Sequence, residues 1–411
     1  MKILWFSPAP LSSGIKGGGS WIIDAARSLS KRHDIDLYYA SEQNVNKLKI
    51  EKFENLVSLQ LPNKQPVWFI KNVRKIFSIS ETTSIKDYYK AIELVKPQII
   101  QVFGSEHDWT SICQVTNLPI LLHLQGIYHC IHKKWFAGIS KVDACKYSSL
   151  KATILRETFY HDYQKGFFRM ENEKFLLKNI NYFIGRTNLD KLIIELFSPT
   201  AKYFHCDEML REEFFKYQWN YHSTKGKIKI ISILRDAPYK GLETIVETIQ
   251  FLEKECRYNI EWNIVGLTSE SQSVRILKKK YKKKYPDNIY LLGRLDSLSI
   301  INYLLNSDMF VHPSHIENSS NSVCEAMLLG MPVIAMFVGG LNSIISNNKT
   351  GILIQEGDPY SLAGMIIKLY ENHEYAVNIG KNARSEAIKR HDPEKIIDTL
   401  IKVYDTIVND D

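Results

Sequence analysis

The sequence predicts an α/β protein with two domains, each built around a mostly parallel β-sheet. The chain has 411 residues, which is more than one hydrophobic core usually serves, so two domains of about 200 residues each are expected. Apolar runs of strand length alternate with helical patterns, and the runs end in small or polar residues, as in parallel α/β sheets. A strongly apolar strand at 228–234 follows a polar segment and starts a second sheet.

The composition is that of a soluble globular protein, with 45% hydrophobic and 24% charged residues. No run of about 18 apolar residues occurs, so no membrane-spanning helix is predicted. The first residues form a short strand and not a signal peptide, because Ser7 and Pro8 end the apolar run. We therefore expect a cytoplasmic protein. The six cysteines are scattered without a C-x-x-C pair, which predicts reduced thiols and neither disulfides nor a zinc site.

The first domain is predicted at 1–210 and opens with a strand followed by a glycine-rich loop. This loop contains Gly17 and Gly18, and Ser20 caps the next helix. Glycines let the backbone approach a ligand closely, although most glycine runs are simply flexible turns. Helices are predicted at 21–30 and 84–95, and strands at 2–6, 35–40, 57–61, 98–103, 119–124, 181–186 and 201–207.

An insertion at 128–178 is rich in Lys, Tyr and Phe. One interpretation is a set of packed helices whose lysines lay their alkyl stems over apolar surface. The other is a surface that binds the acceptor of a reaction and faces a membrane. The sequence leaves both open.

The second domain is predicted at 228–390, after a linker at 211–227 and before a final helix within 391–411. The formal net charge is +8, and part of it lies in the lysine-rich run at 278–284. This run is either a solvated helix face or a site that attracts an anionic partner, such as a membrane surface or a phosphate-rich acceptor. Nucleic acid is not expected, because no known nucleic-acid motif accompanies the run. Further strands are predicted at 261–265, 289–292, 308–311, 331–335 and 351–353, with helices from 242, 299 and 323.

Two cationic residues follow the first strand of the second domain. Arg235 and Lys240 lie five positions apart, and Gly241 and a helix start come next. Two fixed positive charges beside a helix amino terminus suit a diphosphate group, whose charge they neutralise. Residues of this kind are otherwise surface charges.

Two glutamates bracket a polar loop between the strand at 308–311 and the helix that starts at 323. They are Glu317 and Glu325, and Asn321 and Ser322 lie between them. The free backbone N–H groups and the dipole of the following helix predict an anion site at this loop. A structural interpretation is also available, because Ser322 and Glu325 have the spacing of an S-x-x-E capping box and Glu317 could be a solvated carboxylate.

The stretch from His312 to Ala335, with both glutamates, resembles the donor-binding signature of family-four glycosyltransferases, which are retaining enzymes of the GT-B fold. The resemblance implies that Glu325 holds the nucleotide ribose and that Glu317 lies near the donor sugar. The resemblance also implies that Arg235 and Lys240 bind the diphosphate. Further contacts with the donor would come from Gly17, Gly18, Asn321, Ser322 and Arg294. The final helix would cross back to the first domain. Many members have His-Gly where this chain has Gln125 and Gly126, so either Gln125 or the nearby His123 would contact the sugar.

The resemblance implies a retaining transfer of sugar from a nucleoside-diphosphate sugar to a hydroxyl group of a glycan or lipid-linked acceptor. The runs at 185–190 and 205–211 resemble a subgroup of bacterial cell-surface polysaccharide enzymes. No cofactor or metal is implied, since no Asp-x-Asp motif ends a strand and the cations replace it. The enzyme would work in the cytoplasm or at the inner face of the membrane. Two alternatives remain, a nucleotide-sugar epimerase of the same fold and a non-catalytic nucleotide-sugar-binding scaffold.

Overall fold

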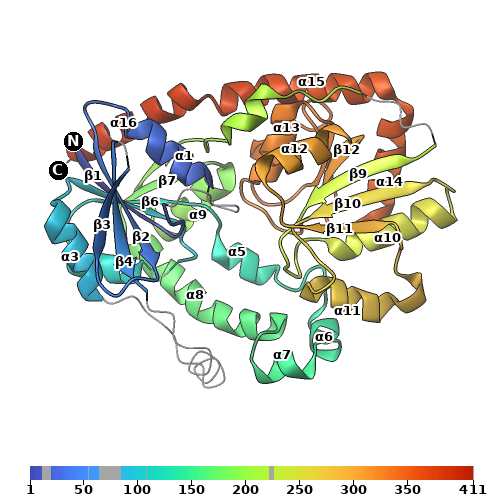
Figure 1. Cartoon of the computed structure of the whole chain (residues 1–411), viewed down its shortest axis with the longest axis horizontal. Helices are drawn as coiled ribbons and strands as arrows, with labels where there is room; N and C mark the ends of the chain where they lie inside the picture. The colour runs from blue at the N-terminus through green and yellow to red at the C-terminus, as the bar shows by residue number, and fades with distance from the viewer. Residues whose placement is uncertain (12–19, 54, 64–84, 108, 222–225, 411) are drawn as a thin grey trace.

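The computed structural model describes residues 1–11, 20–53, 55–63, 85–107, 109–221 and 226–410. Within these residues the chain forms two α/β domains, each with its own sheet (Figure 1). The two sheets lie one after the other along the long axis of the molecule. The predicted fold class is confirmed.

Eight described strands form the first sheet, in the order β3-β4-β2-β1-β5-β6-β7-β8. Neighbouring strands are parallel, except that β3 and β4 pair in antiparallel fashion. The central strands are buried along almost their whole length, which explains their continuous apolar sequences. β3 was not predicted, because its charged sequence KIEKF is largely exposed at the sheet edge. The bounds are β1 Lys2–Ser7, β2 Asp36–Gln43, β3 Lys49–Phe53, β4 Leu56–Pro62, β5 Ile99–Phe103, β6 Ile120–His123, β7 Tyr182–Gly185 and β8 Lys202–His205.

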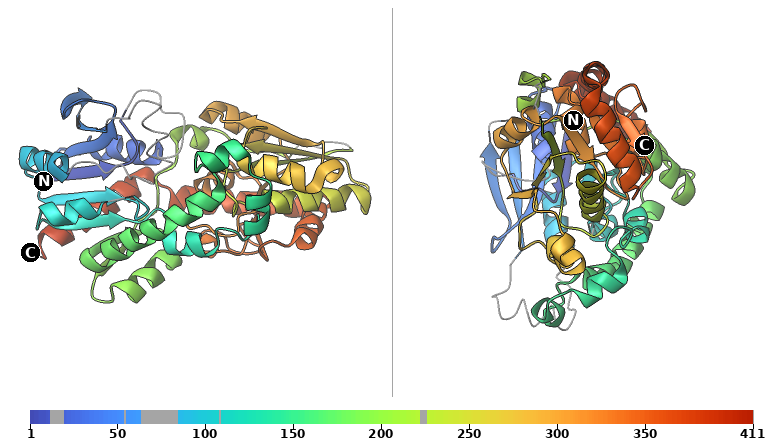
Figure 2. Two further views of the ribbon diagram at one scale, coloured as in Figure 1. Left: turned by 90° about the horizontal axis from the view of Figure 1, so that it is seen from below. Right: turned by 90° about the vertical axis from the view of Figure 1, so that its right-hand side faces the viewer.

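The helices of the first domain include the predicted insertion, which consists of four helices, α5 to α8. The longest of them, α8, runs from the first sheet towards the second domain (Figures 1 and 2). No helix among the described residues is both long and apolar enough to cross a membrane. The bounds are α1 Ser20–Leu29, α3 Ile85–Val95, α4 Thr110–Val115, α5 Tyr128–Lys133, α6 Lys141–Lys146, α7 Leu150–Ile154, α8 Phe159–Asn179 and α9 Asn188–Phe197.

Six described strands form the second sheet, all parallel, in the order β11-β10-β9-β12-β13-β14. The order reverses between β9 and β12, so the loops at their carboxyl ends meet there, where open α/β sheets bind ligands. The strands are β9 Ile228–Ile233, β10 Ile260–Val265, β11 Ile289–Gly293, β12 Met309–His312, β13 Val333–Met336 and β14 Ile352–Ile354. The helices are α10 Leu242–Lys254, α11 Gln272–Tyr281, α12 Ser297–Leu305, α13 Asn321–Leu329, α14 Pro359–Glu371 and α15 His373–Arg390, with short 3₁₀ turns at Glu212–Lys216, Lys282–Lys284 and Leu341–Ser343.

The last helix, α16 (Pro393–Val408), returns to the first domain and packs against α1. Its apolar residues are part of the first-domain core. Tyr404 lies at the centre of this contact: its hydroxyl accepts a hydrogen bond from Trp5 Nε1 at 3.0 Å and donates one to Gln101. The first domain is therefore completed by residues that follow the second domain in the sequence.

The segment predicted as a linker packs firmly on the second domain. Phe214 and Trp219 are buried, and Trp219 donates from its indole N–H to the carbonyl of Ser307 at 2.8 Å. The lysine-rich run also makes contacts within the chain. Lys280 pairs with Asp143 of α6 at 3.0 Å, so part of this run holds the insertion against the second domain.

Candidate active site

The loop between β9 and α10 carries the two predicted cationic residues. Arg235 is exposed, and its Nη2 donates a hydrogen bond to the hydroxyl of Tyr239 at 2.7 Å. The nearby Tyr239 raises the pKa of Arg235, so the guanidinium stays charged. Gly241 ends the loop with a φ of +79°, and a Cβ at this position would lie 2.0 Å from the carbonyl oxygen of Pro313. Only glycine fits there, so the loop lies tightly against the end of β12.

Glu317 lies beside this loop and contacts one of its two predicted cations, Lys240. Its Oε2 accepts a hydrogen bond from Lys240 Nζ at 2.5 Å and pairs with His312 Nε2 at 3.1 Å. Burial would raise the pKa of Glu317, but Lys240 and His312 lower it well below its usual range. The carboxylate is therefore ionised at neutral pH. It is suited to orienting Lys240 and not to donating a proton.

Glycines also fix the loop that carries Glu317. Gly339, in the turn after β13, has a φ of +53°, and a Cβ there would lie 1.8 Å from the carbonyl oxygen of Glu317. The N–H of the following Gly340 donates to that same carbonyl at 3.0 Å. Backbone packing therefore holds Glu317 in place from the side of β13.

Glu325 has a partner that the sequence did not suggest. Arg211 donates to both of its carboxylate oxygens, from Nε and from Nη2, each at 2.7 Å. The capping-box interpretation is wrong: α13 begins at Asn321 with Ser320 as its N-cap, and the Ser320 side chain makes no capping hydrogen bond within the described part of the chain. Ser322 therefore lies inside the first turn and cannot fill the N-cap position. Asn321 and Ser322 are half-buried at the amino terminus of this helix, and the anion site at this loop stays a prediction.

The first domain reaches the same loop through the end of β6. The carbonyl of Gln125 accepts hydrogen bonds from Arg186 Nη2 at 2.8 Å and from Asn318 Nδ2 at 3.1 Å, and Asn318 follows Glu317 in the sequence. His123 is fully buried against Phe103, and burial lowers its pKa to about 3, so the ring is neutral. It pairs through Nδ1 with Gln101 at 3.2 Å.

Three buried polar atoms at these strand ends have no hydrogen-bond partner among the described residues. They are Nε2 of His123, Nε2 of Gln125 and Nδ1 of His312. Buried polar groups are nearly always hydrogen-bonded, so each such atom requires an explanation. A polar ligand between the ends of β6 and β12 would supply partners for them.

A buried ionic network joins the domains behind this site. Glu208 accepts a hydrogen bond from Ser319 and lies 4.0 Å from both Arg186 and Arg390. Burial would raise the pKa of Glu208, but these cations lower it below its usual range. Its carboxylate also lies near Cys324 and His391, a set that could hold a metal ion. The two guanidinium groups already neutralise this carboxylate, so we assign the network to interdomain contact and not to a metal.

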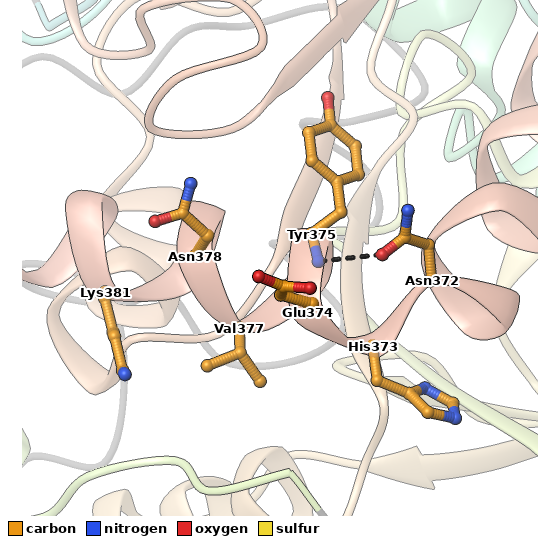
Figure 3. Close-up of a pocket in the computed structure, with 7 residues that line it drawn as sticks. All are labelled: Asn372, His373, Glu374, Tyr375, Val377, Asn378 and Lys381. Atoms are coloured by element: carbon orange, nitrogen blue, oxygen red, sulfur yellow. Dashed lines mark hydrogen bonds between the residues drawn. The ribbon is translucent and has the colours of Figure 1, made fainter.

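Other predicted donor residues lie away from this centre or outside the described residues. Arg294 is exposed at the end of β11. Gly17 and Gly18 lie outside the described residues. A surface pocket at the start of α15 contains none of the predicted residues (Figure 3). It is lined by Asn372, His373, Glu374, Tyr375, Val377, Asn378 and Lys381.

Sequence reasoning missed four residues that shape the site. Tyr239 and His312 lay inside the motifs that were considered, but only the fold shows that they contact Arg235 and Glu317. Arg211 and Asn318 pair with Glu325 and Gln125 over separations of more than 100 residues, and no local pattern indicates such pairs.

Sequence comparisons find known proteins that resemble part of this chain. Residues 213–386 match the family model described as "Glycosyl transferases group 1". The capsular polysaccharide biosynthesis glycosyltransferase CapM of Staphylococcus aureus is 25% identical over 171 residues, which are 42% of this chain and 44% of CapM. N-acetyl-alpha-D-glucosaminyl L-malate synthase of Bacillus anthracis is 30% identical over 125 residues, which are 30% of this chain and 32% of the relative. The matched segments thus span less than half the length of these relatives.

Solved structures extend the likeness of fold to the whole chain. Sucrose-phosphate synthase from Thermosynechococcus elongatus superposes with a TM-score of 0.74 at 16% identity and full coverage of both chains. HepE of Anabaena, solved with UDP-glucose, gives a TM-score of 0.67 at 15% identity, with 99% of this chain and 100% of that chain covered. The chain therefore has the GT-B fold, and its residues 213–386 are similar to the group 1 glycosyl transferases.

Proposed function

We propose that this protein is a retaining glycosyltransferase that moves a sugar from a nucleoside-diphosphate sugar to a hydroxyl group of a glycan or lipid-linked acceptor. The observation that carries the proposal is the arrangement past the adjacent ends of β9 and β12, where Lys240 pairs with Glu317 and the nearby Arg235 is held by Tyr239. CapM, named for capsular polysaccharide biosynthesis, suggests a role in cell-surface polysaccharide synthesis.

The proposed chemistry depends on charge stabilisation. As the bond between the anomeric carbon and the diphosphate oxygen breaks, negative charge develops on the leaving group. Arg235 and Lys240 stabilise this charge, together with the N–H groups at the start of α13. The acceptor oxygen attacks from the face that the diphosphate leaves, and its proton passes to the leaving phosphate. Glu317 stays ionised and holds Lys240 in position before the donor binds. This route requires neither a protein base nor a metal ion.

A binding screen tests the donor site directly. Thermal unfolding is followed with UDP, GDP, ADP and their sugars, since a ligand that binds the folded state raises the midpoint. Saturable stabilisation by one nucleotide supports the proposal and identifies the base. Product analysis with acceptors then checks for transfer and for retention at the anomeric carbon. No stabilisation by any nucleotide, in a folded sample, would favour a non-catalytic role.

We also propose that the insertion and α9 touch an anionic membrane surface, where a lipid-linked acceptor would lie. α8 and α9 pack together and expose Phe168, Phe175, Leu192 and Leu196. The exposed Lys178 lies on the same helix as Phe168 and Phe175, and its positive charge complements anionic lipid.

Sedimentation with phosphatidylglycerol vesicles should bring down the protein, and phosphatidylcholine vesicles should not. A double change of Leu192 and Leu196 to Ser should weaken the binding. Equal recovery with both lipids would refute this contact.

A further inference from the structure

A short segment of the first domain lies directly on the cationic loop of the second. This segment, residues 134–139, follows α5 and is called the strap here. The N–H of Ile139 donates to the carbonyl of Pro238 at 3.0 Å, and Lys134 forms an ion pair with Glu356. Figure 1 shows α5 and α6 reaching across from the first sheet to the second. The strap therefore contacts the loop of residues 235–241 from outside the second domain.

Tyr239 connects the strap to Arg235. The Tyr239 side chain is only 2% exposed, and its ring centroid lies 5.5 Å from that of Trp135 in the strap. Trp135 is itself fixed, because its indole N–H donates to the carbonyl of Phe159 at 3.0 Å. The backbone of Tyr239 is held as well, since its carbonyl accepts from the N–H of His315 at 2.8 Å. A phenol fixed in this way offers a rigid acceptor.

Arg235 requires such a partner because its side chain is exposed. A free arginine side chain samples many rotamers, and holding it in one place before the ligand arrives lowers the cost of binding. The hydrogen bond from Arg235 Nη2 to the Tyr239 hydroxyl, at 2.7 Å, supplies this restraint. Electrostatic stabilisation also depends on charges that are already oriented.

We propose that Tyr239 is a positioning residue for Arg235, and that the strap of the first domain holds Tyr239 in place, so that diphosphate recognition by the second domain depends on the first. The diphosphate part of this inference rests on the proposed function. The positioning part rests on the contacts alone.

Gly138 in the strap offers a way to disturb the contact without replacing any residue of the cationic loop. A Cβ on Gly138 would lie 2.6 Å from the carbonyl oxygen of Pro238 and 2.4 Å from Glu243 Oε2. Gly138→Ala should therefore push the strap away from the loop. The matched control is Gly364→Ala, because a Cβ there meets no atom of the described residues within 4 Å. For Tyr239→Phe the control is Tyr375→Phe. Tyr375 lies on α15, and the substitution removes a hydroxyl that is hydrogen-bonded to Asn348 at 3.2 Å.

The first readout is the rate at which phenylglyoxal modifies Arg235, measured by peptide mass spectrometry on the full chain. Tyr239→Phe and Gly138→Ala should raise this rate about tenfold, the size of losing one hydrogen bond to a charged group. The second readout is nucleotide affinity. Both variants should weaken nucleoside-diphosphate binding by about the same factor and change nucleoside-monophosphate binding much less. Neither control should change either readout.

The outcomes separate the two proposals. Unchanged modification of Arg235 in both variants would overturn the positioning role, even if the wild type binds nucleotides. Faster modification in a protein that binds no nucleoside diphosphate would support the positioning role and reject the proposed function. Equal loss of mono- and diphosphate binding would show that the strap acts on the whole domain and would overturn the specific link to the diphosphate.

Discussion

Replacing Glu325 with Gln should destabilise the protein strongly, because the carboxylate neutralises Arg211 in a mostly buried place. Two bonds of 2.7 Å join the pair, and Glu325 is 5% exposed. Removing one partner of a buried ion pair costs about 3–5 kcal/mol. Gln keeps one acceptor oxygen, and Arg211 retains its bond of 2.9 Å to Ser297. We therefore expect a loss of about 2–3 kcal/mol, and a melting midpoint lower by about 5–10 °C for a domain of this size.

Urea and thermal unfolding would measure this change, with Glu212→Gln as the control. Glu212 pairs with Lys216 at 2.6 Å, but both side chains are exposed, so this substitution should have no measurable effect. Nucleotide affinity of the folded Glu325→Gln protein, measured well below its midpoint, tests the predicted ribose contact separately. A loss of stability under about 0.5 kcal/mol would refute the reasoning, since it would fall within the range of ordinary surface substitutions.

Three further predictions follow from the site. Lys240→Ala should lower kcat/KM about 100-fold by removing a transition-state charge partner, and unchanged kinetics would exclude Lys240 from the mechanism. Burial lowers the pKa of His123 to about 3, so the unfolded state binds a proton more readily than the folded state between pH 6.5 and pH 3. The contribution of His123 to the free energy of unfolding should therefore be complete above pH 6.5 and fall towards pH 3, by up to about 1.4 kcal/mol per pH unit. A His123→Gln variant that keeps this slope in urea titrations would contradict the assignment. Gly241→Ala should destabilise by about 2 kcal/mol or more, because its Cβ would meet Pro313 in a left-handed backbone, whereas Gly364→Ala should not.

The sequence predicted much of the fold, because parallel strands that are buried on both faces have continuous apolar sequences. The predicted strands at 2–6, 98–103 and 228–234 match β1, β5 and β9 within one residue at each end. The closeness of Lys240 and Glu317 also follows from topology, because both lie just past the carboxyl ends of adjacent strands. The apolar runs that mark buried strands depend only on local sequence.

Contacts between segments that are distant in the sequence could not be predicted from it. Arg211 pairs with Glu325, and Trp135 packs on Tyr239, across separations that no periodicity records. The capping-box error has a similar cause. Ser322 and Glu325 had the right spacing, but the helix begins at Asn321. The preceding loop contacts distant segments, because Asn318 accepts a hydrogen bond from Thr187 and the carbonyl of Glu317 accepts one from the N–H of Gly340. Contacts of this kind cannot be predicted from the spacing of two residues.

The placement of α16 has a consequence for synthesis on the ribosome. Tyr404 joins Trp5 and Gln101 inside the first domain, and Ile397 and Leu400 add to the same core. These residues leave the ribosome only after the whole second domain has emerged. The usual order, in which an amino-terminal domain folds first, cannot be completed here. The second domain has all its strands available earlier, so it should reach its native state while its neighbour still waits for the last helix.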